Sequence, residues 1–166
     1  MQQESSFTHI REDSAVRRLL TIEDRKLHLE MNTADEIDNK IYAISPNNHF
    51  YIQGNDWCHH PDLLKGSFAW CAGHISIKKG KITFLSNNSG HYRPSLYHFY
   101  TFVKKLKGEE LFEEDAELNA CDFSRDNFSV DDFLQNFDES LLQEQWKREI
   151  NERMHNDRFL EALFTC

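Results

Sequence analysis

Residues 68–94 read FAWCAGHISIKKGKITFLSNNSGHYRP, and they decide the fold because two strand-like arms and a structured corner follow one another without a gap. Apolar and β-branched residues recur over 68–77 and 81–86, and Lys79-Gly80 separates these arms. Glycine adopts the positive φ angle of a two-residue turn without steric cost. The stretch therefore predicts an antiparallel hairpin.

Strand alternation assigns Cys71 to the protein core. Side chains two residues apart share one face of a strand, so Cys71 lies on the same face as Ala69, Ile75 and Ile77. We expect a buried, structural thiol. His74 is three residues away and falls on the opposite face, so this pair could bind one metal ion only across a bulge.

Two further elements flank the predicted hairpin. Upstream, residues 41–45 and 49–53 surround Pro46-Asn47-Asn48, whose composition is typical of a turn, and this pattern predicts a first hairpin. Downstream, Ser95 is a suitable helix N-cap and Gly108 a suitable end. The apolar residues between them recur at helical spacing: Leu96, Phe99, Phe102, Val103 and Leu106.

We therefore expect one α+β fold with a small, mainly antiparallel sheet, made of two hairpins plus a possible edge strand at 118–123, followed by packed helices. Residues 1–39 are predicted to be a polar N-terminal arm with a short helix over 14–23. Residues 40–123 are expected to form the α+β core domain. Residues 124–166 are expected to form C-terminal helices packed on that core.

Charge and cysteine content exclude several classes of protein. The 166 residues carry 28 acidic and 19 basic side chains, a net charge of -9 that argues against a nucleic-acid partner. Residues 1–10 hold no apolar run, so we expect no membrane span and a cytoplasmic start. The four cysteines lack the spacing of a disulfide scaffold, which fits a reducing compartment.

The corner Ser89-Gly-His-Tyr-Arg-Pro94 is the candidate ligand-binding site. Ser89, His91, Tyr92 and Arg93 place a hydroxyl, an imidazole, a phenol and a guanidinium at the start of the predicted helix. A helix N-terminus beside an arginine favours an anion such as a carboxylate or phosphate. The alternative is a structural latch, in which these polar groups bond to one another. His60 is the expected companion of the corner.

The sequence also allows an enzymatic function for these residues. A hydrolase could use Cys58 or Ser89 as nucleophile with His60 or His91 as base, and another enzyme, such as a transferase, could use His91 and Tyr92. No Gly-x-Ser-x-Gly elbow and no cysteine-protease signature is present. The Cys and His residues do not fall into a chelating spacing, so we predict no metal and no other cofactor.

A resemblance to a known family rests on five short stretches. They are Ile41-Tyr-Ala-Ile-Ser45, His60-Pro-Asp-Leu-Leu-Lys-Gly66, Ala72-Gly73, Gly80-Lys-Ile82 and Ser89-Gly-His-Tyr-Arg-Pro94. Over about residues 40–123 the chain resembles a domain shared by plant IQ-motif calmodulin-binding proteins and by bacterial toxin-like or effector-like proteins. Pro61-Asp62 and His74 depart from the family pattern, which puts any family role at those positions in doubt.

The resemblance implies a small bacterial effector or toxin-related virulence protein that acts as a binding module. Its expected location is the bacterial cytoplasm, or a host or target cell after export without a signal peptide. Its expected partner is a protein or a small anionic ligand. Calmodulin is not supported, because Leu142-Gln143 and Lys147 are followed by Arg148 in place of glycine and by Glu152 in place of a basic residue.

Overall fold

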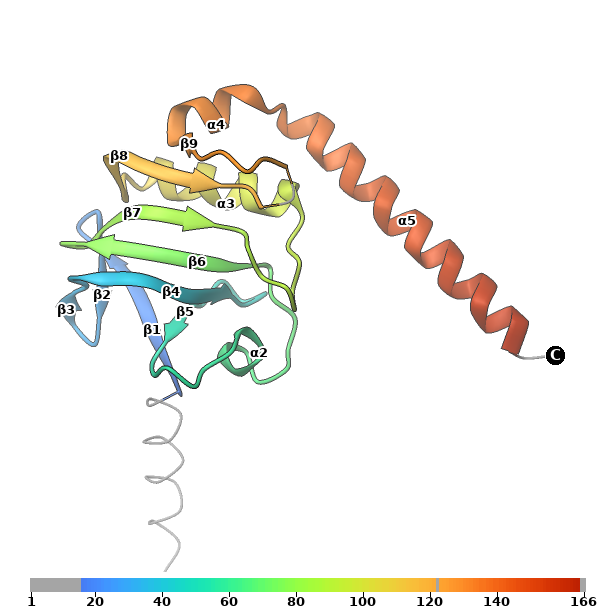
Figure 1. Cartoon of the computed structure of the whole chain (residues 1–166), viewed down its shortest axis with the longest axis horizontal. Helices are drawn as coiled ribbons and strands as arrows, with labels where there is room; N and C mark the ends of the chain where they lie inside the picture. The colour runs from blue at the N-terminus through green and yellow to red at the C-terminus, as the bar shows by residue number, and fades with distance from the viewer. Residues whose placement is uncertain (1–15, 122, 165–166) are drawn as a thin grey trace, which may run out of the picture.

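The computed structural model describes residues 16–121 and 123–164. Over these residues nine strands form one curled sheet in the order β3-β2-β1-β5-β4-β6-β7-β8-β9 (Figure 1). The strands are β1 Arg17–Glu23, β2 Lys26–Leu29, β3 Asn32–Thr33, β4 Ile37–Ile44, β5 Phe50–Gln53, β6 Cys71–Lys78, β7 Lys81–Ser86, β8 Phe112–Asn119 and β9 Phe128–Ser129. The helices are α2 His60–Leu63, α3 Leu96–Gly108, α4 Val130–Asn136 and α5 Glu139–Phe164.

The sheet is mixed because one of its pairs is parallel. Neighbouring strands run antiparallel except β7 and β8. Parallel neighbours need a crossover connection, and α3 supplies it between these two strands. Helix α3 buries Phe99, Phe102, Val103 and Leu106 in the main core on one face of the sheet.

A second, smaller core lies around α2. Its buried members are Ala43, Cys58, Leu63, Leu64 and Ala72. Ala43 and Ala72 belong to the central strands β4 and β6, whose neighbouring side chains Ile44 and Cys71 belong to the main core instead. Strand alternation thus gives the central strands two apolar faces.

The two predicted hairpins and the predicted helix are confirmed. Strands β4 and β5 pair antiparallel, as do β6 and β7, with Lys79 and Gly80 at φ angles of 50° and 78° in the turn. Ser95 caps α3 by accepting a hydrogen bond from the His98 N–H. Cys71 is fully buried, as its place in the strand pattern predicted.

The expected small, mainly antiparallel sheet of two hairpins is wrong, because residues 17–33 contribute three more strands. The helix predicted over 14–23 is a strand from Arg17 onward, and residues 14 and 15 lie outside the described residues. The turns after β1 and β2 explain the error. Asp24-Arg25 and Glu30-Met31 have positive φ angles of 49°, 60°, 50° and 70° without the glycine or asparagine that marks such turns.

The predicted edge strand at 118–123 is also displaced. Strand β8 begins at Phe112, so it includes the acidic residues Glu113, Glu114 and Asp115. Ala116 and Leu118 are buried and Glu117 between them is exposed, which is the alternation of a strand with one face in the core. Strand β9 pairs with β8, so β8 is not the edge of the sheet.

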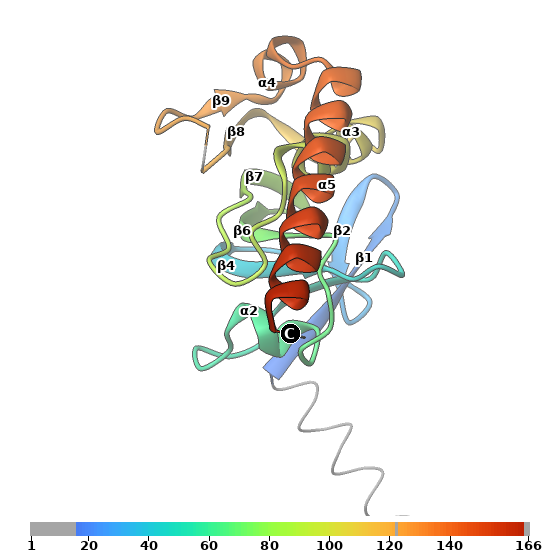
Figure 2. The ribbon, with the colours of Figure 1, turned by 90° about the vertical axis from the view of Figure 1, so that its right-hand side faces the viewer.

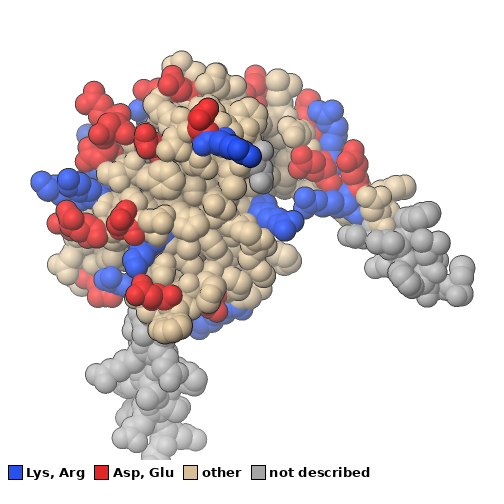
Figure 3. Space-filling model, in the orientation of Figure 1, with Lys and Arg blue, Asp and Glu red and all other residues tan. Residues whose placement is uncertain are grey.

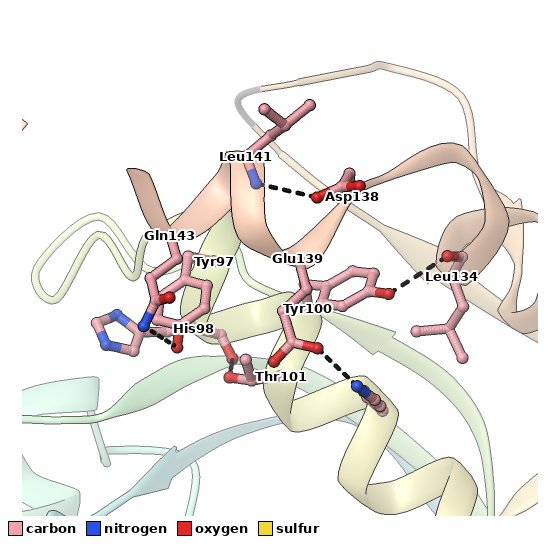
Figure 4. A network of polar contacts seen from close by, with 10 residues as sticks. Tyr97, His98, Tyr100, Thr101, Leu134, Asp138, Glu139, Leu141 and Gln143 are labelled. Atoms are coloured by element: carbon pink, nitrogen blue, oxygen red, sulfur yellow. Dashed lines mark hydrogen bonds and ion pairs between the residues drawn. The ribbon is translucent and has the colours of Figure 1, made fainter. Parts of the chain in front are cut away.

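Helix α4 packs on α3, β8 and β9, and α5 meets the core through α3. Phe133 of α4 is fully buried, and Trp146 of α5 stacks on Tyr97 with ring centroids 5.5 Å apart. Figure 4 shows Gln143 of α5 donating a hydrogen bond to the Tyr97 hydroxyl. The far part of α5 extends away from the body of the protein in Figure 1 and runs in front of it in the turned view of Figure 2, and residues 151–156 are exposed.

Charged side chains of both signs are interspersed on the face drawn in Figure 3. Lys and Arg alternate with Asp and Glu at the hairpin ends and along α5, and an uncharged area lies between them. This face therefore carries no basic patch of the kind that a nucleic acid requires. Among the helices that the structure describes, none is both long and apolar enough to cross a membrane.

Candidate functional site

The corner Ser89–Pro94 is a turn closed by its own hydrogen bonds. The buried Ser89 accepts two of them, one at its carbonyl oxygen from the Arg93 N–H at 2.9 Å and one at Oγ from the Tyr92 N–H at 3.2 Å. Arg93 has a φ of 44°, and its exposed side chain donates from Nε to the Gly90 carbonyl at 3.1 Å. Ser89 is thus a support under the turn, while His91 and Arg93 are exposed above it.

His60 is held in a defined tautomer at the start of α2. Its Nε2 lies 2.9 Å from the Gly73 carbonyl oxygen, which can only accept, so Nε2 carries the proton. In the neutral ring Nδ1 is therefore an acceptor. Burial lowers the pKa of His60, the bond to Gly73 opposes this shift, and the charges of His74 and His91 lower the pKa further. His60 is consequently neutral at pH 7.

Two aromatic rings lie beside the His60 ring, and a third lies next to one of them. His74 stands perpendicular to His60 with ring centroids 5.7 Å apart, and Tyr92 lies 6.4 Å away. The His91 ring is 5.0 Å from that of Tyr92. Burial also lowers the pKa of His74, against a hydrogen bond with the Asn88 backbone. Helix α2, strand β6 and the corner thus bring three histidines and a tyrosine together.

The hydroxyl of Tyr92 is a buried donor. The ring packs against the small core around α2, and Oη has no hydrogen-bond partner among the described residues. Burial raises the pKa of Tyr92, and the charge of Asp62 raises it further. The phenol therefore stays protonated at neutral pH and can donate a proton or a hydrogen bond.

Gly73 allows the corner to approach the sheet. A Cβ at this position would lie 1.8 Å from the Ser86 carbonyl oxygen, so only glycine fits between β6 and the end of β7. The same carbonyl accepts a hydrogen bond from Tyr42 Oη at 2.9 Å. Since Ser86 ends β7 and Ser89 begins the corner, this close approach fixes where the corner starts.

Both buried cysteines are unsuited to nucleophilic attack. Burial raises the pKa of Cys71 to about 12, and burial together with Asp62 raises that of Cys58 to about 11. The attacking species is the thiolate, which is scarce at such values. Among the described residues, no three His, Cys, Asp or Glu side chains are grouped closely enough to hold a metal ion.

The structure brings three of the predicted site residues together, and it places the other two at different depths of the turn. His60, His91 and Tyr92 are neighbours, Ser89 lies beneath the turn, and Arg93 extends from its surface. His74 was missed as a member of the cluster. The sequence offered one indication of its role: strand alternation places His74 on the face of β6 opposite Cys71. Side chains on that face contact the segments that cover β6 there.

Comparison with known proteins places the chain in a family. A protein-family model described as "IQ motif-containing protein middle domain" matches residues 16–99, which include His60, His74 and the whole corner. The chain belongs to this family. The chain is 32% identical over 76 residues to IQ domain-containing protein IQM3 of Arabidopsis thaliana, and this match covers 46% of the chain and 16% of that protein. No solved structure matches it.

The comparisons confirm the plant half of the predicted resemblance. They give no support to the expected link with bacterial toxins and effectors. The relative is a plant protein, which contradicts the bacterial location that we expected. The chain matches only 16% of that relative's length, so the activity of the longer protein does not follow from the match.

Proposed function

We propose that this domain is a binding module whose ligand-contacting surface is formed by His60, His91, Tyr92 and Arg93, with Ser89 as the support of the turn. The observation that carries the proposal is the pairing of exposed and buried polar groups at one corner. His91 and Arg93 offer donors to solvent, while the Tyr92 hydroxyl is buried without a partner among the described residues. A purely structural latch would use such donors internally.

The ligand expected at this surface is an anionic group, either on a small molecule or on an acidic side chain of a protein partner. Arg93 is permanently charged and fork-shaped, which suits a carboxylate or a phosphate. The chain as a whole carries a net charge of -9, so an exposed arginine beside histidines is a local departure from its surroundings. His60 adds a neutral imidazole with an acceptor nitrogen.

Ligand titrations with matched variants test this proposal. Wild-type protein is titrated with acetate, citrate and inorganic phosphate while the side-chain NMR signals of histidine and arginine are followed. We expect saturable shifts that Arg93→Ala weakens about tenfold, the loss of one charged hydrogen-bonded contact. Arg148→Ala removes an exposed arginine of α5 and is the control. Equal titrations of Arg93→Ala and wild type would exclude the corner as an anion site.

An enzyme is the second candidate, favoured by one observation. A base and an acid are neighbours: His60 is neutral with Nδ1 as its acceptor nitrogen, and Tyr92, whose ring centroid lies 6.4 Å away, is protonated. Proton transfer at a bound substrate would use both. The raised pKa values of Cys58 and Cys71 argue against the cysteine alternatives.

Assays with activated esters and phosphoesters test the enzymatic candidate. If His60 and Tyr92 act in chemistry, His60→Gln and Tyr92→Phe each lower the wild-type rate at least tenfold while the melting temperature stays within a few degrees. Wild-type rates no higher than those of either variant would exclude this use of the pair.

A further inference from the structure

A cavity lies on the other side of the sheet, away from the corner. It has a volume of about 240 Å³ and lies between β1, the start of β5 and the C-terminal half of α3. Figure 2 shows the β1–β2 hairpin and α3 on the same side of the molecule. Its lining is mostly apolar and includes Leu19, Ile22, Phe50, Phe102 and Leu106.

The rim of this cavity exposes a large apolar side chain. Ile22 of β1 is 40% exposed, although β1 is an inner strand of the sheet, and it lies on the same strand face as Leu20, which pairs with Phe50. Below it Phe50, Phe102 and Leu106 are buried members of the main core. An exposed apolar rim continuous with an apolar floor differs from an isolated exposed side chain and marks a binding surface.

The charge at the mouth of the cavity is positive. Lys105 of α3 lines it, and among the residues that the structure describes no aspartate or glutamate does, although the chain has 28 acidic residues. Lys105 Nζ bonds to the neutral amide of Asn48 at 2.9 Å. Its neighbours on α3 are instead paired with acids, Lys104 with Glu139 and Lys107 with Asp131. Lys105 can therefore accept an incoming anion without giving up an ion pair.

We propose that this cavity binds a small amphipathic carboxylate, with its hydrocarbon part against Ile22, Phe50 and Phe102 and its carboxylate on Lys105. The volume of the cavity and the charge of Lys105 support the same ligand class. A dry cavity of ~150 Å³ in another protein holds benzene, so a volume of about 240 Å³ takes a short acyl chain or a substituted aromatic ring. Burial of the hydrocarbon supplies affinity, and the ammonium group selects the anion.

Octanoate and octan-1-ol separate these two contributions. Both are titrated into the full chain by calorimetry below the concentration at which octanoate forms micelles. Octanoate is expected to bind the wild type about tenfold more tightly than octan-1-ol, and Lys105→Gln is expected to remove that difference. Lys104→Gln, on the same helix but outside the cavity, is the matched control and keeps it. Equal affinity for the two compounds in wild-type protein would overturn the carboxylate assignment.

A rim variant tests the location. Ile22→Asp introduces a carboxylate beside the cavity and is expected to abolish octanoate binding, whereas Met31→Asp changes a side chain that is 96% exposed elsewhere and leaves binding intact. Octanoate binding that survives Ile22→Asp overturns the proposal. A second result would also overturn it: the wild type is a dimer that does not bind octanoate, and Ile22→Asp converts it to a monomer. The rim would then be a self-association surface.

Discussion

Replacing Gly73 by alanine tests the close approach that fixes the corner to the sheet. The added Cβ would lie 1.8 Å from the Ser86 carbonyl oxygen and 2.6 Å from its carbon. Both are backbone atoms of a paired strand, so no side-chain rotation can relieve the overlap. The two backbone segments would have to separate by at least about 1 Å in a closely packed interior.

The cost follows from the strain and from the bonds that this separation weakens. Overpacking of this kind costs about 1–3 kcal/mol. Two hydrogen bonds to Ser86 would lengthen with it, from Tyr42 Oη at 2.9 Å and from the His74 N–H at 3.2 Å. At about 1 kcal/mol each, the total loss is about 3–5 kcal/mol. Domains of this size have about 5–15 kcal/mol of stability, so the variant is expected to be marginally folded.

Urea unfolding of Gly73→Ala and Gly90→Ala checks this reasoning with the same chemical change at two glycines. A Cβ at Gly90 meets no atom within 4 Å, and the free energy of unfolding of that variant should lie within about 1 kcal/mol of the wild type. His60 should also lose its defined tautomer in Gly73→Ala, visible in its ring NMR signals. If Gly73→Ala proves as stable as Gly90→Ala, the approach of Ser86 to β6 is not as close as described.

Three further outcomes are expected. Ser95→Ala removes the N-cap of α3 and should lower the free energy of unfolding by about 1 kcal/mol in urea melts. Ser95→Asp should restore it. A free energy of unfolding for Ser95→Ala equal to that of the wild type would contradict the capping role. At pH 8 a maleimide should modify the exposed Cys121 and spare the native Cys58 and Cys71, and rapid labelling of Cys71 would refute its burial. Because burial lowers the pKa of His60, the unfolded chain binds a proton at higher pH than the folded chain does, so stability should fall as the pH drops below 6.5 and level off once the folded ring titrates. His60→Gln should flatten this decline, measured by urea midpoints between about pH 7 and pH 5, and an unchanged slope would exclude His60 as its source.

Elements with strong local signals were predictable from the sequence. Helix α3 has a serine cap, helical apolar spacing and a terminal glycine, and each is a property of a few adjacent residues. The hairpin of β6 and β7 has Lys79-Gly80 at a turn that needs positive φ angles. In these elements the local preference agrees with the tertiary structure.

The first three strands were not predictable in the same way. Asp24-Arg25 and Glu30-Met31 adopt left-handed turns that their own preferences do not favour. What holds them is the pairing on either side, such as Leu20 with Leu29 and Ile22 with Leu27. The parallel pairing of β8 with β7 is likewise decided by distant residues, because α3 must first cross the sheet.

The corner was found from its residue types, but its surroundings were not. Gly90 and Pro94 marked a turn and the polar residues marked chemistry, as the sequence shows. His60 and His74 reach the corner only because the close approach at Gly73 brings β6, β7 and α2 together. Such proximity depends on nonlocal packing, which residue spacing within one segment does not encode.

Helix α5 is long and contacts the first turn of α3 near one of its ends. The helix has 26 residues, and the part beyond Trp146 extends for ~27 Å. Trp146 packs on Tyr97 and His98, which belong to the first turn of α3 and follow the corner directly in the chain. A tilt of ~10° at this contact would move the far end of α5 by ~5 Å. Any event at the corner that repositions that turn is therefore enlarged into a displacement that a partner on α5 could sense.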